Sequence, residues 1–176
     1  MNAAAAPATA LAETAARVRV LVLDVDGVLT DGRLYYGLRG EALKVFHVRD
    51  GLGLKLLAQA GITVAVISGR RSSMTGTRCR ELGIKHVLQG VADKLAAFER
   101  LRGRLRVAAG LCACVADDVS DLPLMREVGL SFAVADAHPQ ARSAADVVTD
   151  LPGGTGAVRE ICDFLLEARR RGGAAP

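Results

Sequence analysis

Short runs of apolar residues, many of them β-branched, alternate along this chain with longer segments in which apolar residues recur every three or four positions. The first pattern predicts buried strands, and the second predicts amphipathic helices. The predicted strands span residues 18–25, 63–67, 86–88, 111–116, 130–134 and 147–148. The predicted helices span residues 51–60, 72–82, 94–102, 123–128, 139–143 and 156–169. This order favours right-handed crossovers, and therefore an α/β, Rossmann-like three-layer sandwich with a central parallel sheet.

One stretch breaks the alternation. Residues 33–36 and 43–48 are strand-like and flank a turn at 37–41 that holds two glycines, which predicts a β-hairpin inserted after the first strand. The apolar side chains of this hairpin, which have no obvious place in the main core, are Leu34, Tyr36, Leu43, Val45 and Phe46. An apolar hairpin that leaves a compact domain favours a contact between subunits.

The composition favours a single domain. The 176 residues, 51% of them hydrophobic, suffice for one core, which we place within residues 17–169. The net charge is only +4, which gives little attraction for a phosphate backbone, and the 3% of aromatic residues offer little surface on which bases could stack. Nucleic acid is therefore not expected as a partner. No apolar run approaches the length of a membrane span, so a membrane is not expected as a partner either.

The two ends of the chain are predicted to be mobile tails. Residues 1–16 are rich in alanine and lack the basic start and leucine-rich stretch of a signal peptide. Residues 170–176 are predicted to be mobile as well. The four cysteines have neither zinc-ligand spacing nor a CxxC pair, and free thiols suit a reducing cytoplasm.

Residues 21–32, LVLDVDGVLTDG, combine an apolar strand with two aspartates one residue apart. Side chains alternate along a strand, so Asp24 and Asp26 lean the same way. Gly27 lets the backbone turn sharply, which holds both carboxylates at the strand's exit, where a phosphate and a metal ion could meet them. The alternative is an ordinary strand end, because aspartate and glycine are common in turns.

Further polar residues follow the other predicted strands. Ligands bind at the carboxyl ends of the strands in an open parallel sheet. Besides the two aspartates, the candidates at that edge are Ser68, Arg70, Lys94, Asp117, Asp118 and Asp121. Taken singly, Ser68 is typical of a turn and Lys94 of a solvated helix. Asp121 is predicted to cap the helix that follows it, and also to steady a metal site.

Four segments, DVDGVLTDG, ISGR, the lone lysine in ADKLAAF, and ADDVSDLPLM, resemble in this order the signature motifs of the haloacid dehalogenase superfamily of phosphatases. FHVRDGLG, RCRELGI, LSFAVADAHP and GGTGAVREICDFLL extend the likeness to its capless, tetrameric members that act on phosphorylated sugar acids. The match covers nearly everything between Val20 and Leu166. The chain departs from the family at Ala116, where glycine is usual and a methyl group could crowd the metal loop.

The resemblance implies a role for each candidate. Asp24 would attack phosphorus to form an aspartyl phosphate, and Asp26 would protonate the leaving oxygen and then activate water. Mg²⁺ would be held by Asp24, the backbone carbonyl of Asp26, and Asp117. Ser68 and Lys94 would bind phosphoryl oxygens and stabilise charge in the transition state.

The resemblance also implies a set of substrate contacts. They are Asp26, His47, Val48, Arg49, Asp50, Gly51, Lys55, Arg70, Arg78 and Lys94, with Arg78 coming from an adjacent chain. At His47 and Lys55 the family more often has asparagine and arginine. Without the resemblance, Arg78 would be equally typical of an exposed charged helix face. Gly153, Gly154 and Gly156 suit either a phosphate-cradling loop, placed as a lid near a neighbouring site, or a flexible entry to the last helix.

The expected insertions are small, namely the hairpin and one helix with one strand, so the protein is predicted to be capless. An open site must either accept a large substrate or be closed by a neighbouring subunit, and the resemblance favours a homotetramer. It implies a cytoplasmic Mg²⁺-dependent phosphomonoesterase acting on 3-deoxy-D-manno-octulosonate 8-phosphate in lipopolysaccharide biosynthesis. The alternatives are a phosphatase of a nine-carbon, sialic-acid-type sugar phosphate, a non-catalytic oligomeric scaffold, and a phosphoprotein or nucleic-acid phosphatase with an open basic cleft.

Overall fold

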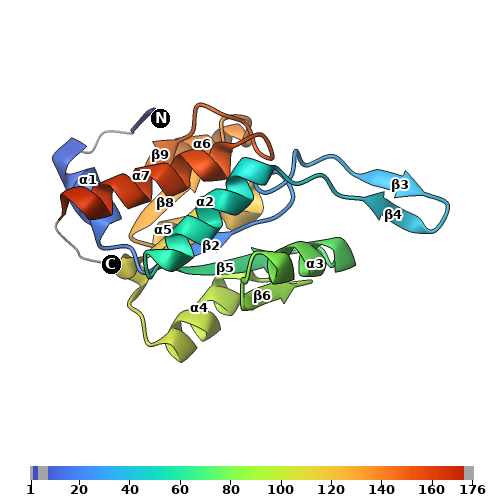
Figure 1. Cartoon of the computed structure of the whole chain (residues 1–176), viewed down its shortest axis with the longest axis horizontal. Coiled ribbons are helices and arrows are strands. Elements are labelled where there is room, and N and C mark those ends of the chain that lie inside the picture. The colour runs from blue at the N-terminus through green and yellow to red at the C-terminus, as the bar shows by residue number, and fades with distance from the viewer. Residues whose placement is uncertain (1, 4–7, 173–176) are drawn as a thin grey trace.

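A seven-stranded sheet forms the middle of the molecule in the computed structural model, which describes residues 2–3 and 8–172 (Figure 1). The strand order is β1-β9-β8-β7-β2-β5-β6. All neighbours pair in parallel except β1 and β9, which are antiparallel. The strands are β1 (Asn2–Ala3), β2 (Val20–Leu23), β5 (Thr63–Ser68), β6 (His86–Gln89), β7 (Cys112–Ala116), β8 (Leu130–Ala133) and β9 (Val147–Val148).

Two groups of helices flank the sheet. In one group α7 contacts α1 and α2, and in the other α4, α5 and α6 contact one another in succession. The helices are α1 (Ala8–Ala16), α2 (Val48–Gln59), α3 (Ser73–Glu81), α4 (Lys94–Leu105), α5 (Leu122–Glu127), α6 (Pro139–Ala144) and α7 (Ala157–Arg171), with 3-10 turns at Ala109–Leu111 and Val119–Asp121. Strands β2, β7 and β8 are buried throughout, as a sheet covered on both sides requires. The predicted α/β sandwich is confirmed.

The chain ends differ from the prediction. A mobile tail over residues 1–16 is wrong for Ala8–Ala16, which form α1, because Leu11 and Ala15 lie one helical turn apart and are buried where α1 contacts α7. Helix α7 continues to Arg171, past the predicted end at residue 169, and Glu167 forms ion pairs with the arginines of this last turn. The predicted tail is also wrong for Asn2–Ala3, which form β1 and pair with β9. Residues 1, 4–7 and 173–176 lie outside the described residues.

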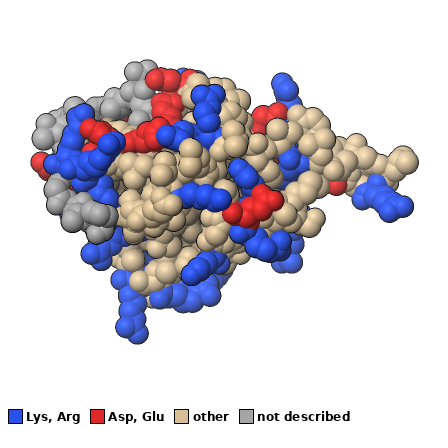
Figure 2. Space-filling model, in the orientation of Figure 1, with Lys and Arg blue, Asp and Glu red and all other residues tan. Residues whose placement is uncertain are grey.

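The predicted hairpin is present and projects from the domain (Figure 1). Its strands are β3 (Tyr35–Gly37) and β4 (Gly40–Leu43), so the predicted second strand at 43–48 is wrong: the tight turn lies at Leu38 and Arg39. Gly40 permits that turn because its φ is +104°. Leu38 is fully exposed, and Figure 2 shows that most of the hairpin surface carries neither sign of charge.

Phe46 is an exception among the apolar residues predicted to leave the core. Leu34, Tyr36, Leu43 and Val45 are exposed, whereas Phe46 packs against the core. The guanidinium carbon of Arg78 lies 6.0 Å from the centre of the Phe46 ring. The segment between β4 and α2 is therefore tied to the domain, and only the two strands and their turn project.

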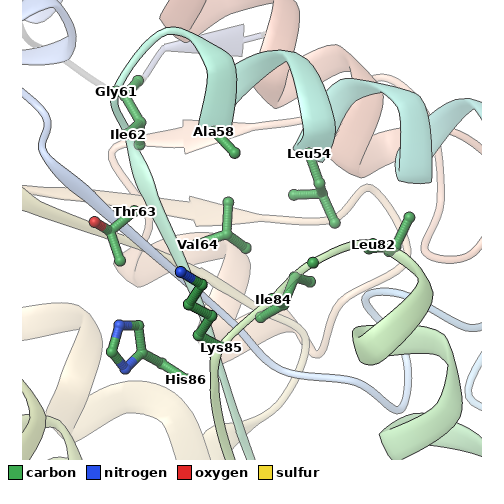
Figure 3. Close-up of a pocket in the computed structure, with 11 residues that line it drawn as sticks. Leu54, Ala58, Gly61, Ile62, Thr63, Val64, Leu82, Ile84, Lys85 and His86 are labelled. Carbon is green, nitrogen blue, oxygen red and sulfur yellow. The ribbon is translucent and has the colours of Figure 1, made fainter.

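The register of the central strands places the candidate residues. Leu23 of β2 lies opposite Val66 of β5 and Val115 of β7. All three strands run in the same direction, so Asp24, Ser68 and Asp117 reach one edge of the sheet. A cavity of about 360 Å³ lies at the opposite edge, near the start of β5 and β6, and it is lined by apolar residues together with Lys85 and His86 (Figure 3). Among the described residues, no helix is both long and apolar enough to cross a membrane.

Candidate active site

The first turn of the site follows β2 directly. Asp24 accepts a hydrogen bond from the backbone N–H of Val25 at 2.7 Å. Gly27 adopts a φ of +88°, and a methyl group on it would collide with the carboxylate of Asp117. Glycine is thus required here both for the turn and for the close approach of the second carboxylate, so DVDG and the acid after β7 form one structural unit.

The predicted catalytic residues line one cavity of about 400 Å³. The predicted residues that line it are Asp24, Asp26, Ser68, Arg70, Lys94, Asp117 and Asp118. Ser68 is the last residue of β5 and is buried. Lys94 is the first residue of α4, whose N-cap, Asp93, accepts a hydrogen bond from the N–H of Ala96 at 2.9 Å. The cap fixes the start of the helix, and this places the lysine at the cavity.

Lys94 provides a buried positive charge between two carboxylates of the site. Its Nζ donates to Asp24 Oδ2 at 2.8 Å and to Asp121 Oδ1 at 2.7 Å, and its side chain is almost fully buried. The prediction that Asp121 caps the following helix is wrong, because its side chain makes no capping hydrogen bond. Asp121 instead lies beside the acids of the site, where it was also predicted to steady a metal.

Three carboxylates can share a cation. Ligand oxygens of Asp24, Asp117 and Asp121 all lie within 4.8 Å of one another. Burial and the neighbouring carboxylates raise the pKa of Asp117 to about 7, and burial raises the pKa of Asp121 to about 6. Asp121 Oδ2 is buried without a hydrogen-bond partner. A small, hard, oxygen-seeking cation such as Mg²⁺ fits this set, because it would neutralise the repulsion and could satisfy the orphaned oxygen.

The sequence-based prediction missed a group of charges at the base of the hairpin. Lys44 forms an ion pair with Asp26 Oδ1 and lies 3.3 Å from Glu41 Oε1. Arg70 Nη2 donates to Glu41 Oε1 at 3.3 Å and to the hydroxyl of Tyr36 at 3.5 Å. The available signal was Glu41 and Lys44, two charged residues three positions apart that interrupt the apolar pattern of the second half of the hairpin.

The predicted substrate contacts divide into two groups. Arg70 and Lys94 line the cavity, whereas among the described residues of one chain His47, Arg49, Lys55 and Arg78 do not. Val48, Arg49 and Lys55 are exposed on α2. Contact between this second group and substrate stays a prediction.

The two remaining predicted substrate contacts, Asp50 and Gly51, are part of the packing between helices. The carboxylate of Asp50 is buried and accepts a hydrogen bond from the N–H of Arg159 at 2.8 Å, which links the starts of α2 and α7. Burial raises the pKa of Asp50 above its usual value. Gly51 lies against the Arg78 guanidinium group and Leu82, so a side chain at this position would displace them. These contacts hold the 47–51 stretch in place beside α3 and α7.

The glycine loop before α7 supports the DVDG turn. Gly153 packs so closely on the backbone of Gly27 that a side chain would collide with it, and Gly154 (φ +66°) packs on Thr30 in the same way. The N–H of Gly153 donates to Asp136 Oδ1 at 2.9 Å, and that of Gly154 donates to the Val28 carbonyl at 3.0 Å. The interpretation as a phosphate cradle is therefore wrong for these two amides, which already have partners within the chain.

Comparison with known proteins decides the family. The model of the haloacid dehalogenase-like hydrolases matches residues 84–161. The 3-deoxy-D-manno-octulosonate 8-phosphate phosphatase KdsC of Salmonella typhi is 51% identical over 155 residues, which cover 88% of this chain and 82% of that protein. The chain belongs to the KdsC phosphatase family of haloacid dehalogenase-like hydrolases.

Solved structures of KdsC-type phosphatases share the fold. The enzyme from Yersinia pestis is 46% identical, with a TM-score of 0.89 over 92% of this chain and 87% of the other. The enzyme from Moraxella catarrhalis is 40% identical, with a TM-score of 0.91 over 94% of this chain and 95% of the other, and its crystal structure contains a magnesium ion, a phosphate ion and KDO.

Ala116 departs from the glycine expected in the KdsC family without displacing the strand. It is buried at the end of β7 and lies in register with Ala133 of β8. Asp117, the next residue, still reaches the cavity. The methyl group is therefore accommodated in the sheet, and Asp24 and Asp117 remain together at the cavity.

Proposed function

We propose that the chain hydrolyses 3-deoxy-D-manno-octulosonate 8-phosphate to the free sugar acid and phosphate with Mg²⁺ as cofactor. The observation that carries the proposal is the convergence of Asp24, Lys94 and Asp117 on one cavity in a chain 51% identical to a KdsC phosphatase. The Moraxella relative, crystallised with magnesium, phosphate and KDO, supports both the cofactor and the substrate class.

We assign the role of nucleophile to Asp24. Its Oδ1 accepts the Val25 N–H and its Oδ2 accepts from Lys94, so both oxygens are held in fixed directions. Burial raises the pKa of Asp24, and the positive charge of Lys94 opposes that rise. Attack of the carboxylate on phosphorus forms an aspartyl phosphate, which hydrolyses more readily than the sugar ester.

The remaining residues of the cavity transfer protons or stabilise negative charge on the phosphoryl group. Asp26 transfers a proton to the departing sugar oxygen and later accepts one from water. Ser68 and Lys94 donate hydrogen bonds to phosphoryl oxygens as negative charge develops. Mg²⁺ held by Asp24, Asp117 and the Asp26 carbonyl would neutralise the repulsion between the carboxylate and the phosphate dianion.

Substrate choice follows from Arg70 and from the hairpin. Arg70 is partly exposed at the cavity, and its planar guanidinium group suits the carboxylate of a sugar acid. Arg78 of an adjacent chain and the 47–51 stretch complete the contacts in a homotetramer whose exposed apolar hairpins pack together. We place this enzyme in the cytoplasm, in lipopolysaccharide biosynthesis.

Phosphate release from a substrate panel tests this function. The panel holds the eight-carbon sugar acid phosphate, a nine-carbon analogue, a phosphopeptide and a DNA 3′-phosphate. We expect the highest kcat/KM for the eight-carbon substrate, a requirement for Mg²⁺, and loss of activity in Asp24→Asn. Asp163→Asn is the matched control, since Asp163 lies on α7, is not among the residues that line this cavity, and accepts a hydrogen bond from Arg159 Nε at 2.8 Å. Equal rates on all substrates would refute the specificity, and full activity of Asp24→Asn would refute the nucleophile.

A further inference from the structure

The active site contains a second buried lysine, at the base of the hairpin. We propose that Lys44 is a positioning residue that holds Asp26 in the orientation from which it exchanges protons with the leaving group and with water. The inference rests on the proposed function, because it concerns how that site protonates its leaving oxygen.

The burial of Lys44 carries the first step of the argument. The Lys44 side chain is only 2% exposed, and its Nζ forms an ion pair with Asp26 Oδ1 and a second one, at 3.3 Å, with Glu41. A buried ammonium group is costly without its carboxylate partners, so the three groups favour one shared arrangement. The position of Asp26 Oδ1 is thereby fixed from the side of the hairpin.

The two oxygens of Asp26 have different surroundings. Oδ1 faces the buried Lys44, whereas Oδ2 lies 3.6 Å from Nε of Arg70, whose side chain is 41% exposed and lines the cavity. That longer contact is not a hydrogen bond. Oδ2 is therefore the oxygen that remains free to carry and deliver a proton on the cavity side.

The proton steps balance with this assignment. In the first step the bond from Asp24 to phosphorus forms, the ester P–O bond breaks, and the proton on Asp26 Oδ2 moves to the departing sugar oxygen. In the second step a water oxygen attacks phosphorus, the bond to Asp24 breaks, and a proton of that water moves to Oδ2. Lys44 keeps its own proton throughout and acts only through the orientation of Asp26.

The alternative role for Lys44 is structural. The pair with Glu41 spans three residues at the end of β4 and could simply anchor the hairpin. An anchor would act whether or not Asp26 can carry a proton, so the loss caused by its removal would persist in an Asp26→Asn variant. A positioning role for a proton donor requires Asp26 and affects only those substrates whose leaving group needs a proton, and this difference separates the two roles.

Leaving-group dependence provides the test. A sugar alkoxide needs protonation to depart, whereas p-nitrophenolate does not, and kcat/KM reports the steps up to that departure. For Lys44→Met we expect kcat/KM to fall about 30-fold or more on the sugar acid phosphate but less than about threefold on p-nitrophenyl phosphate, because general acids contribute about 10²- to 10⁴-fold. Lys44→Arg should recover part of the loss. Lys85→Met, at the far cavity of Figure 3, is the charge-matched control and should match wild type on both substrates.

A double-mutant cycle completes the test. In an Asp26→Asn background, adding Lys44→Met should cause no further loss on the sugar acid phosphate, because the residue through which Lys44 acts is already gone. Equal losses on both substrates, or a full additional loss in that background, would overturn the proposal. If Lys44→Met lacks the native circular dichroism spectrum, Glu41→Gln, which removes the second carboxylate charge at the ammonium group, takes its place.

Failure of the proposed function would look different. If wild type released phosphate from p-nitrophenyl phosphate but not from the sugar acid phosphate, the substrate assignment would fail. The Lys44 comparison would then use whichever alkyl phosphate the enzyme turns over, and its outcome would still decide the role of Lys44.

Discussion

The cavity at the strand ends and the β3–β4 hairpin contribute to the same site but differ in construction. At the cavity, Ser68 and Lys94 are buried, as is Asp121, which pairs with Lys94. The strands β2, β5 and β7 behind them pair in register through the middle of the sheet. In the hairpin, Tyr36 and Leu38 are exposed, and its two short strands pair only with each other. The cavity residues are thus packed within the domain, whereas the hairpin has an exposed surface in one chain.

This difference separates chemistry from recognition. Nucleophile, proton donor and metal ligands must be held within a fraction of an ångström, which rigid core strands can provide. Closure of the cavity and choice of the sugar need a surface that a second copy can complete. Lys44 joins the two regions, since it lies just after β4 and forms its ion pair with Asp26 after β2. A change at the nucleophile or the metal ligands should therefore affect all substrates, whereas a change at the tip of the hairpin should affect the large ones.

The largest effect is expected from Gly27→Ala in the cavity. The added methyl group collides with the Asp117 carboxylate and places alanine at a φ of +88°. We expect kcat to fall about 100-fold on every substrate and the Mg²⁺ concentration for half-maximal activity to rise, since displaced metal ligands have effects of this size.

Gly83→Ala is the matched control for that variant. Gly83 has a similar φ of +74° with no atom within 4 Å of the added methyl group, so it carries the backbone strain alone. The free energy of unfolding of Gly83→Ala should fall by only about 1 kcal/mol, and its kcat should equal that of wild type. A similar loss of activity in both variants would attribute the effect to strain rather than to Asp117.

A smaller and more selective effect is expected from Leu38→Asp at the tip of the hairpin. Leu38 is fully exposed in one chain, so the substitution should leave the melting temperature of a monomer unchanged. If hairpins pack together, light scattering should show a smaller particle. We also expect kcat/KM to fall about tenfold on the sugar acid phosphate and little on p-nitrophenyl phosphate, as expected for one or two lost charged contacts. An unchanged particle size would remove the hairpin from the assembly.

The smallest effect concerns pH and Mg²⁺. The pKa of Asp117 is raised from 3.8 to about 7 in the folded chain without metal. The protonated group therefore favours folding at low pH, and that contribution is lost as the pH rises from about 4 to 7. Mg²⁺ needs the ionised carboxylates, so its effect on the melting temperature should be larger at pH 8 than at pH 5. Asp117→Asn should flatten this dependence, and an equal Mg²⁺ effect at both pH values in wild type would contradict it.

The sequence predicts the buried parts of this molecule better than its edges. Apolar runs such as those that became β2, β5 and β7 have one favourable environment, the sheet interior, so their order and direction could be predicted. Asp24 and Asp117 follow such runs and could be placed with them. Helix α1 could not, because nine residues rich in alanine are a marginal helix alone, and the contact of Leu11 and Ala15 with α7 that stabilises it is tertiary.

Which charged residues pair with one another in the site could not be predicted from the sequence either. Asp121 has the position of an N-cap, yet its carboxylate pairs with Lys94, and the two residues are 27 positions apart. Lys44 and Asp26 are 18 positions apart and meet because the chain returns from the projecting hairpin to the end of β2. Such contacts depend on tertiary packing, which local patterns do not encode.

The most direct test of the central claim is to locate the phosphoryl group during turnover. Asp26→Asn, which retains the nucleophile but lacks the base for hydrolysis, is mixed with Mg²⁺ and p-nitrophenyl phosphate, quenched in acid and digested for tandem mass spectrometry. We predict one phosphoryl group on Asp24 and its absence in Asp24→Asn. Turnover without a phosphorylated aspartate, or with the phosphoryl group on another residue, would contradict the assignment of Asp24 as the nucleophile.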